Sequence, residues 1–396
     1  MKLASRLERF SEPETLKMAK LARELRAQGH DVIGLSLGEP DFDTPDHIKK
    51  AMVDAVNNNY SHYPPVAGYL ELRQAACNKL KRDNNLDYKP ENIIVSTGAK
   101  QSIANLVFAT VEGGDDVIIP TPYWVSYSEI VRLAEANPIL VKTKYENKYK
   151  ITAEELEAAI TPNTKLFMFS SPCNPTGSVY SREELASLVQ VFVKYPQIII
   201  MSDEIYEYTN YVGANVSIAE FPEVKDRVAI INGLSKGYAM TGYRLGYMAA
   251  NTDIVKACDK IQGQMTSGTN AATQQAAVVA LNADLQPTLD MVKEFGERRK
   301  IVLQYLSEIP NVRCIEPDGA FYVFPDVSAY FGKKFGEQVI ANADDLAMYL
   351  LEQAHVSSVS GGAFGEPSCL RLSYAASRED LQKGFGRIKE AFAQLA

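Results

Sequence analysis

Polar side chains that could bind or act on a small ligand follow several apolar runs in the middle of the sequence. Lys236 lies among Gly, Ser and Ala in "NGLSKGYAMTGYRLGY", with Arg244 eight positions further on. Asp203 follows the apolar run "IIIMS", and Tyr206 comes three residues later. Asn174 lies just beyond the run "LFMFS". An open α/β sheet binds its ligands beyond the carboxyl ends of its strands, so these residue types indicate one binding site.

A phosphate site is indicated by "STGAKQS", which continues from the apolar run "IIVS". Gly98, Ala99 and Lys100 open the next helix, where free backbone N–H groups and the positive end of the helix dipole favour an anion. Each motif also has an ordinary explanation. A lysine after a strand is mostly a solvated loop residue, Asp203 could cap a helix, and "NPTG" is typical of a turn. Their joint occurrence past successive strands favours a site.

The elements that must position these residues are predicted by the apolar runs themselves. The runs are rich in Ile and Val and do not alternate with polar residues, which is typical of strands buried on both faces. Helical segments lie between them, such as 181–195, where Ser181 and Glu184 form a candidate capping box. We expect an α/β fold with a mostly parallel seven-stranded sheet covered by helices. The expected strands are 93–96, 116–120, 138–142, 165–170, 198–202, 227–232 and 246–250.

A chain of 396 residues is too long for one small core, so two domains are expected. Residues 46–284 hold the strands and form the predicted large, cofactor-binding domain. The segments 1–45 and 285–396 form a smaller α+β domain, because the C-terminal part alternates strand-like runs such as "GAFYVFP" with helices. We place the N-terminal helix, about 12–28, against this C-terminal unit.

Composition excludes several other classes of protein. A net charge of −8 without basic runs argues against a nucleic-acid partner. No apolar run approaches the roughly 20 residues of a membrane span, and the charged N-terminus does not match a signal peptide. Four histidines without metal-ligand spacing predict no metal site. Five scattered cysteines are typical of a reducing compartment, so the expected location is cytoplasmic.

The order of motifs identifies a family. "YPPVAG", "STGAKQS", "YWVSY", "NPTG", "SDEIYE", "SKGYAMTGYRLGY", "GAFYVF" and "LRLSYA" together resemble the fold-type I, class I pyridoxal-phosphate aminotransferases. The chain is most similar to the bacterial aspartate aminotransferases that begin with "GEPDFDTP", found here at 38–45. The motifs extend over residues 38–375, nearly the whole chain. The resemblance implies pyridoxal 5'-phosphate as cofactor and ping-pong transfer of an amino group from L-aspartate to 2-oxoglutarate.

The resemblance implies a role for each polar residue around the cofactor ring. Lys236 is the residue that forms the Schiff base and then moves a proton at the substrate α-carbon. Asp203 pairs with the ring nitrogen and keeps it protonated. Asn174 and Tyr206 donate hydrogen bonds to the phenolate oxygen. Trp124, the only tryptophan, stacks on the ring, although a lone tryptophan is also common in protein cores.

The cofactor phosphate is implied to bind the backbone of Ala99 and Lys100, the hydroxyl of Ser235 and the guanidinium of Arg244. Arginine suits this position because its planar fork makes two bonds to phosphate and keeps its charge. Tyr63, in "YPPVAG", resembles the tyrosine that reaches the phosphate of the neighbouring subunit. The resemblance therefore implies a homodimer with shared active sites.

Substrate recognition is implied at both ends of the amino acid. Arg371, in "CLRLSYA", matches the arginine that binds the α-carboxylate, and the Gly38 backbone approaches the same group. One branch of the family binds the distal carboxylate with an arginine, which this sequence lacks between residues 260 and 275. The other branch uses a lysine at the position of Lys100. The implied substrate-binding residues are Gly38, Lys100, Trp124, Asn174 and Arg371.

Two positions depart from the family pattern. Many relatives have a phosphate-binding serine where this chain has Gly233, for which Ser235 could compensate. Some relatives that also transaminate prephenate carry a basic residue near position 11, whereas this chain has Ser11 and Glu12. Prephenate activity is therefore not expected.

Two alternative functions remain open from the sequence. An aromatic or broad-specificity aminotransferase, or a β-lyase, would keep the fold and the cofactor but change the substrate. A cofactor-binding module of a transcription regulator would have no catalytic role. The intact Lys236 and Arg371, and the lack of a DNA-binding extension, argue against the second alternative.

Overall fold

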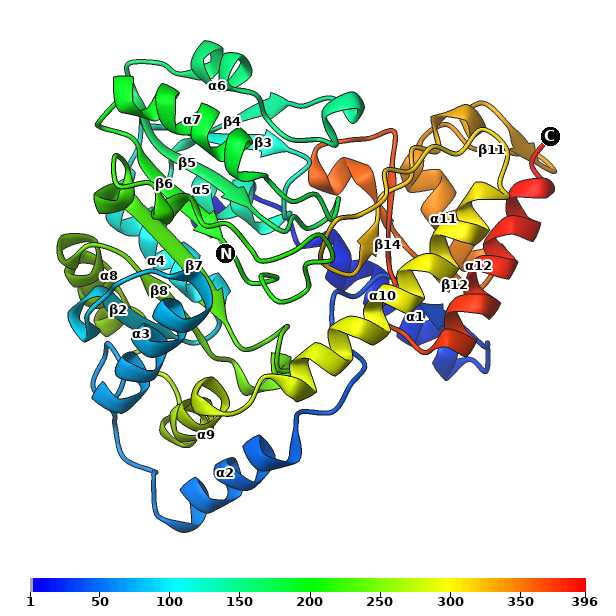
Figure 1. The fold of residues 1–396 in the computed structure, drawn as a ribbon. Helices are drawn as coiled ribbons and strands as arrows, with labels where there is room; N and C mark the ends of the chain where they lie inside the picture. Colours follow the sequence, from blue (N-terminus) through cyan, green and yellow to red (C-terminus); the bar gives the residue numbers. More distant parts are fainter. Residues whose placement is uncertain (1–2) are drawn as a thin grey trace.

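The seven-stranded sheet of the computed structural model, which describes residues 3–396, contains all seven predicted strands (Figure 1). Their order is β2-β8-β7-β6-β5-β3-β4. Strand β8 runs antiparallel to its two neighbours, β2 and β7, and the other neighbouring strands pair in parallel. The mostly parallel sheet is therefore confirmed. The bounds are β2 Ile93–Ser96, β3 Asp116–Thr121, β4 Asn137–Lys142, β5 Thr164–Ser170, β6 Ile199–Asp203, β7 Val228–Gly233 and β8 Gly246–Ala249.

Helices cover both faces of this sheet because its strands carry apolar side chains on both sides. One face packs against α3 (Leu70–Asn84), α7 (Arg182–Lys194) and α9 (Ala271–Asn282). The other face packs against α4 (Ala99–Thr110), α5 (Ser126–Leu133) and α8 (Thr252–Met265). Layers of this kind leave the ends of the strands as the accessible parts of the sheet.

The predicted capping box begins α7. The Ser181 hydroxyl accepts from the Glu184 N–H at 3.2 Å, and the Glu184 carboxylate accepts from the Ser181 N–H at 2.7 Å. These two bonds satisfy backbone donors that the first turn of a helix leaves free. The helix therefore begins at the predicted residue.

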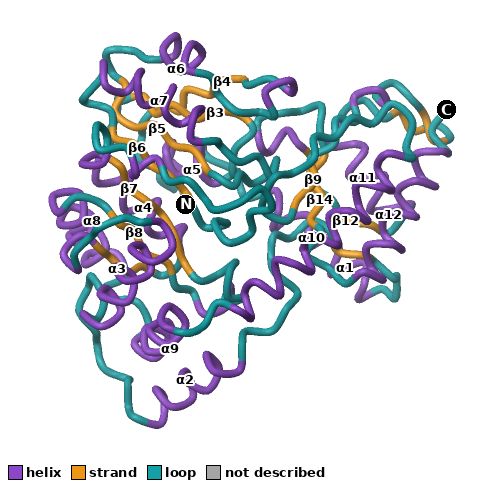
Figure 2. The backbone as a smooth tube through the Cα atoms, in the orientation of Figure 1, coloured by secondary structure: helices purple, strands orange, loops and turns teal. Residues whose placement is uncertain are grey.

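A second group of helices and short strands lies beside the sheet (Figure 2). It encloses a second hydrophobic core that is built from both ends of the chain. It is formed by α1 (Glu14–Ala27), α10 (Gln286–Ser307), α11 (Ala343–Gln353) and α12 (Arg378–Ala393), packed around short strands. The helix expected at 12–28 is α1, and its Met18 and Ala22 pack in this C-terminal core. In Figure 1, α10 runs from the α9 side of the sheet into this part of the molecule.

Short strands join the N-terminal and C-terminal segments. The strand β1 pairs in parallel with β12, and β14 lies between β13 and β9. Leu35 also accepts a backbone hydrogen bond from Ser373, which brings the segment before Gly38 next to the end of β14. The remaining bounds are β1 Ile33–Gly34, β9 Tyr322–Val323, β10 Lys334–Phe335, β11 Gln338–Val339, β12 Val356–Ser357, β13 Val359–Ser360, β14 Leu370–Ser373, α2 Asp46–Asn57 and α6 Ala153–Ala159.

Three further features concern residues 3–396 only. None of the helices in this range has the length and apolarity needed to cross a membrane. No group of three or more His, Cys, Asp or Glu side chains in it could hold a metal ion. All five cysteines lie within it and are unpaired, four of them buried.

Candidate active site

A cavity of about 350 Å³ lies where the carboxyl ends of the parallel strands meet the second core. Strands β5, β6 and β7 end at Ser170, Asp203 and Gly233, and the segments that follow them contribute to its walls. The cavity brings together eleven of the predicted site residues, which are Gly38, Ala99, Lys100, Trp124, Asn174, Asp203, Tyr206, Ser235, Lys236, Arg244 and Arg371.

Tyr63 is the one predicted site residue outside this cavity. Its side chain is 95% exposed and lines a different hollow, together with Tyr60 and Gly268. The role predicted for Tyr63 is in the active site of a neighbouring subunit. Its position outside the cavity of its own chain is compatible with that role, which stays a prediction.

Lys236 projects from the turn after β7 into the cavity. Its Nζ donates a 2.5 Å hydrogen bond to the Gly38 carbonyl. Burial lowers the pKa of this amine to about 8, an effect that the positive charges of Arg371 and Arg244 strengthen and the carboxylate of Glu39 opposes. A pKa near 8 makes the neutral, nucleophilic amine accessible close to neutral pH.

Asp203 is buried at the end of β6. One carboxylate oxygen accepts from the Tyr127 hydroxyl at 2.6 Å, and the other accepts from the Ile205 N–H at 3.2 Å. Burial raises the pKa of this carboxyl to about 6, because the two hydrogen bonds and the charge of Lys236 offset only part of the desolvation. A cationic group placed against this carboxylate would be stabilised by it.

Arg371, on β14, is a buried cation whose bonded partners are neutral. Its Nη1 donates to Asn174 Oδ1 at 3.1 Å and its Nη2 donates to the Ser36 carbonyl at 2.5 Å. The guanidinium lies 4.7 Å from the ring centroid of Tyr322 and 4.9 Å from that of Phe364. Its Nε has no hydrogen-bond partner in residues 3–396. A buried charge is costly without a partner, so this arrangement favours binding of an anion.

The predicted phosphate cradle is assembled at the start of α4. Gly98 precedes the helix with φ of 84°, and a Cβ there would lie 2.4 Å from Arg244 Nη2. Arg244 itself has a left-handed backbone with φ of 56°, and its Nη1 donates to the Thr241 carbonyl at 2.8 Å. The first N–H groups of a helix have no intrahelical acceptor. The guanidinium and these donors together suit a phosphate.

Lys100 and Trp124 lie together at the wall of the cavity. The Lys100 ammonium lies 4.9 Å from the Trp124 ring centroid, and burial together with the charge of Arg244 lowers its pKa. Trp124 packs edge to face with Tyr127 at 5.6 Å, which orients its indole. The side chain of Lys100 is therefore placed to meet a ligand that enters the cavity.

Two tyrosines in the cavity were not predicted. Tyr127 lies one helical turn after Trp124, a spacing that could have indicated a shared face. Tyr322 lies in "GAFYVF", and its hydroxyl is 2.6 Å from that of Tyr206. A Cβ at Gly38 would lie only 1.9 Å from the Tyr322 hydroxyl oxygen. Nothing in the local sequence indicates that contact, because the two residues come from opposite ends of the chain.

The structure gives a packing reason for Gly233. It pairs with Gly246 across β7 and β8, and a Cβ at Gly233 would lie 2.9 Å from both Gly246 Cα and the Leu245 carbonyl oxygen. Gly246 is restricted in turn, because a Cβ there would lie 2.2 Å from the Ala99 nitrogen. The strands approach each other too closely for a serine at position 233.

Comparison with known proteins places this site in a family. Residues 30–388 match the family model of aminotransferase class I and II. The chain belongs to this aminotransferase family. It is 44% identical to an aspartate/prephenate aminotransferase of Nitrosomonas europaea, with 98% of this chain and 99% of the relative covered. It is 43% identical to an aspartate aminotransferase of Bacillus subtilis, with 98% of each covered.

Solved aminotransferase structures share the fold over the full length. The aspartate aminotransferase of Rhizobium meliloti superposes with a TM-score of 0.96 at 39% identity and covers 100% of both chains. That of Thermus thermophilus, solved with maleate, has a TM-score of 0.93 at 36% identity and covers 99% of this chain and 100% of its own. The family, the fold type and the aminotransferase activity implied by the sequence motifs are thereby confirmed.

Aminotransferases of this family use pyridoxal phosphate, and the cavity contains groups that suit it. The start of α4 and Arg244 match a phosphate, and the buried carboxylate of Asp203 matches a protonated ring nitrogen. Lys236 offers an amine with a lowered pKa. This set of donors fits the cofactor without any substitution.

Proposed function

We propose that this aminotransferase transfers an amino group from L-aspartate to 2-oxoglutarate by a ping-pong reaction. The observation that carries the proposal is a pair of cations in one cavity, the buried Arg371 guanidinium and the Lys100 ammonium. Both substrates are dicarboxylates, and two separate cations suit their two carboxylates. The aspartate aminotransferases among its relatives, one of them solved with maleate, support the same substrate class.

The residues around the cofactor divide the work of binding it. Ala99, Lys100 and Ser235, with the Arg244 guanidinium, would hold the phosphate, and Asp203 would pair with the ring nitrogen. When bound, pyridoxal phosphate withdraws electrons from the α-carbon of the amino acid, which makes the proton on that carbon acidic.

Asn174, Tyr206 and Trp124 complete the proposed ring site. Asn174 already accepts a bond from Arg371, and the Tyr206 hydroxyl bonds that of Tyr322, so both are oriented by neighbours. Trp124 supplies an aromatic face. Groups that are held in place before the ligand binds need little reorganisation energy during the reaction.

The amine of Lys236 is the proposed proton carrier. With the cofactor bound, Lys236 would hold it in the resting enzyme and, once free, would take the proton from the substrate α-carbon. A base is most effective when its pKa lies near the working pH, as that of Lys236 does. Arg371 and the Gly38 backbone hold the α-carboxylate during this transfer, while Lys100 holds the distal carboxylate.

A substrate panel tests the proposal. Values of kcat/KM are measured for aspartate, glutamate, phenylalanine, alanine and cysteine sulfinate with 2-oxoglutarate, and for prephenate with aspartate as donor. We expect the dicarboxylates to exceed phenylalanine and alanine by at least about 10-fold, which is the worth of one charge-assisted hydrogen bond. Higher efficiency with phenylalanine would contradict aspartate specificity and favour the aromatic alternative, since a structural relative from Pyrococcus horikoshii is an aromatic aminotransferase.

Prephenate tests the N-terminal arm. Thr15 and Leu16 line the cavity, and the Ser11 N–H donates to Glu129 at 2.8 Å, so this arm borders the site. Ser11 and Glu12 bring no positive charge to it. We expect turnover of prephenate well below that of 2-oxoglutarate, and comparable values would contradict this expectation.

We also propose that the enzyme is a homodimer in which Tyr63 reaches the phosphate of the other subunit. The aromatic side chain of Tyr63 is 95% exposed, and α2, which precedes it in the sequence, exposes Val53 and Val56. Exposed apolar groups of this kind are common at interfaces between subunits.

Mixed dimers test the shared site. Tyr63→Ala and Lys236→Ala subunits are purified separately, then unfolded and refolded together. A mixed dimer has one site with both defects and one with neither, so activity should return to a substantial fraction of wild type. An active monomer in size-exclusion chromatography, or no gain on mixing, would contradict the proposal.

Two further proposals concern organisation. We propose that residues 46–284 form the large domain and that 1–45 with 285–396 form the small one, supported by the separate hydrophobic cores. We propose a cytoplasmic location, supported by five unpaired thiols in the described chain. Limited proteolysis and localisation of a tagged chain test these two points.

A further inference from the structure

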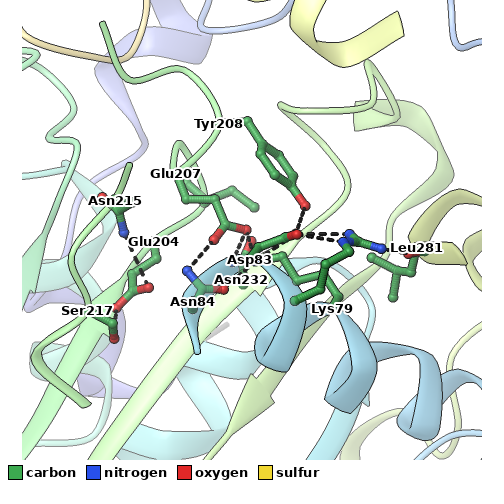
Figure 3. Close-up of polar contacts among 12 residues, drawn as sticks. Lys79, Asp83, Asn84, Glu204, Glu207, Tyr208, Asn215, Ser217, Asn232 and Leu281 are labelled. Carbon is green, nitrogen blue, oxygen red and sulfur yellow. Dashed lines mark hydrogen bonds and ion pairs between the residues drawn. The ribbon is translucent and has the colours of Figure 1, made fainter. Parts of the chain in front are cut away.

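The segment "SDEIYE" carries two buried glutamates, Glu204 and Glu207, that the chemistry above leaves unused. Asp203 and Tyr206 of this segment line the cavity, whereas Glu207 is buried outside it. One oxygen of Glu207, Oε1, accepts a 2.7 Å hydrogen bond from the side-chain amide of Asn232 (Figure 3). Asn232 precedes Lys236 by four residues. The bond therefore joins the two segments that carry the acid and the amine of the site.

This bond begins where the backbone pairing between β6 and β7 stops. The paired register of the two strands ends at Asp203 and Ile231, where the Glu204 N–H still donates to the Ile231 carbonyl at 2.9 Å. Beyond this point Glu207 bonds the side chain of Asn232, and Asn232 Oδ1 accepts from the Gly233 N–H at 2.7 Å. This side-chain bond therefore continues the connection between the two segments beyond their last paired residues.

Glu207 is anchored to α3 by a buried ion pair. The Lys79 ammonium, about 1% exposed, bonds Glu207 Oε1 and donates to Asn84 Oδ1 at 2.8 Å. The Asn84 amide donates to Glu207 Oε2 at 3.0 Å. Both carboxylate oxygens are therefore held, and rotation of the Glu207 side chain away from Asn232 would break several buried bonds. Loss of one partner of a buried pair is strongly destabilising.

The same cluster contacts the chain on the other side of the lysine. The Tyr208 hydroxyl donates to Asp83 Oδ2 at 2.6 Å, and Asp83 lies 3.9 Å from the Lys79 ammonium. The Tyr208 ring lies so close to Gly237 that a Cβ there would be 2.6 Å from it. Gly237 follows Lys236 directly. The turn that carries the amine is thus braced before and after the lysine.

We propose that Glu207 is a positioning residue for the aminotransferase reaction. Through Asn232 it fixes the Lys236 amine relative to Asp203, and Lys79 is the counter-charge that holds Glu207 in place. The inference rests on the proposed role of Lys236. A displacement of about 1 Å at a reacting group can lower a rate by about 100-fold, so a small shift of this turn has a measurable effect.

Two double variants separate positioning from charge burial. Lys79→Met removes the buried cation in both, and position 207 becomes Gln in one and Leu in the other. Glutamine keeps an oxygen for Asn232 and can bond a reoriented Asn84 amide, whereas leucine offers no acceptor. Neither leaves an unpaired charge in the cluster, so both avoid the largest cost of a single substitution.

The readouts are kcat per bound cofactor, KM for aspartate, and the pH midpoint of the absorbance change of the bound cofactor. We expect the Gln variant to stay within about 3-fold of wild type in kcat. We expect the Leu variant to lose about 10- to 100-fold in kcat with little change in KM, and to shift the pH midpoint. A purely structural role would lower thermal stability and cofactor occupancy but leave kcat per bound cofactor and the midpoint unchanged, which would overturn the inference.

Asn232→Ala provides a second test in case the Leu variant does not fold. It leaves the pair of Glu207 and Lys79 intact and removes the bond from Asn232 to Glu207, together with the bond that Asn232 accepts from the Gly233 N–H. A loss of kcat and a shifted midpoint support the inference, and wild-type values of both overturn it. Lys236→Ala, measured alongside, distinguishes the two proposals, because activity retained in that variant would refute the role of Lys236 itself.

Discussion

The Tyr127 hydroxyl donates a 2.6 Å hydrogen bond to Asp203 Oδ2, which joins the first turn of α5 to the end of β6. The bond is buried, and a bond to an ionised carboxylate stabilises the charged form. Tyr127 therefore opposes the burial that raises the pKa of Asp203 to about 6. It keeps the carboxyl ionised at neutral pH, as an ion pair with a protonated ring nitrogen requires.

Tyr127→Phe should therefore raise the pKa of Asp203 further and weaken cofactor binding. A hydrogen bond to a charged group is worth about 1.5–3 kcal/mol, so the dissociation constant of pyridoxal phosphate should rise by about 10- to 100-fold. Fluorescence titration of the cofactor-free enzyme measures it. Tyr123→Phe is the control, because within residues 3–396 the Tyr123 hydroxyl bonds the neutral Ser128 and no carboxylate. Equal effects of the two substitutions would contradict the role of Tyr127.

The sheet and most of the cavity could be predicted because their signals are local in sequence. Continuous apolar runs mark strands buried on both faces, and polar residues within a few positions of the end of such a run lie near the carboxyl end of the strand. Lys236, Asp203 and Asn174 follow this rule. The helix start at Ala99 and the capping box of α7 are likewise encoded within a few residues.

The contacts that orient those residues could not be predicted, because they join distant parts of the chain. Tyr127 and Asp203 are 76 positions apart, and Tyr206 and Tyr322 are 116 apart. No periodicity of the sequence links such pairs. The reason for Gly233 is also tertiary, since it depends on the close approach of β8.

Lys100→Met should lower activity toward acidic substrates selectively. The ammonium lies against Trp124 at the cavity wall, and methionine keeps the aliphatic length without the charge. We expect kcat/KM for aspartate to fall by about 10- to 100-fold and that for alanine by less than about 3-fold. Lys256→Met, on the exposed side of α8, is the matched control. A uniform loss for both substrates would assign Lys100 to the cofactor phosphate alone.

Gly38→Ala should impair the site without a change of charge. A Cβ at position 38 would lie 1.9 Å from the Tyr322 hydroxyl oxygen, so the segment that accepts the Lys236 bond must move. Overpacking of this kind costs about 1–3 kcal/mol. We expect the loss of transition-state stabilisation, measured through kcat/KM for aspartate, to be of the same size. Gly386→Ala is the control, since it adds a methyl group in open space within α12. Wild-type kinetics of Gly38→Ala would show that the backbone can yield there.

Gly233→Ser should destabilise the enzyme rather than improve phosphate binding. The serine Cβ would press against Gly246 Cα and the Leu245 carbonyl oxygen, both 2.9 Å from it. Backbone atoms cannot rotate away as a side chain can, so we expect a loss of about 1–3 kcal/mol in the free energy of unfolding. Denaturant titration measures it. Tighter binding of pyridoxal phosphate at unchanged stability would contradict this account of the glycine.

The reaction of Lys236 with pyridoxal phosphate should depend on pH near neutrality in the cofactor-free enzyme. Burial lowers the pKa of this amine to about 8, whereas an ordinary lysine has a pKa of about 10.4. Only the neutral amine attacks an aldehyde, so the rate should rise as the pH increases through about 8 and level off above it. Borohydride trapping followed by peptide mass spectrometry measures the rate at Lys236 alone.

Two neighbours should move this midpoint in opposite directions. Arg371 lowers the pKa of Lys236 by charge repulsion, so Arg371→Met should shift the midpoint to higher pH. Glu39 raises that pKa by attraction, so Glu39→Gln should shift the midpoint to lower pH. The two shifts separate the charge effect from burial, which neither substitution removes. A midpoint near 10 in the wild-type enzyme, or shifts of the same sign, would contradict the assignment of Lys236 as the activated amine.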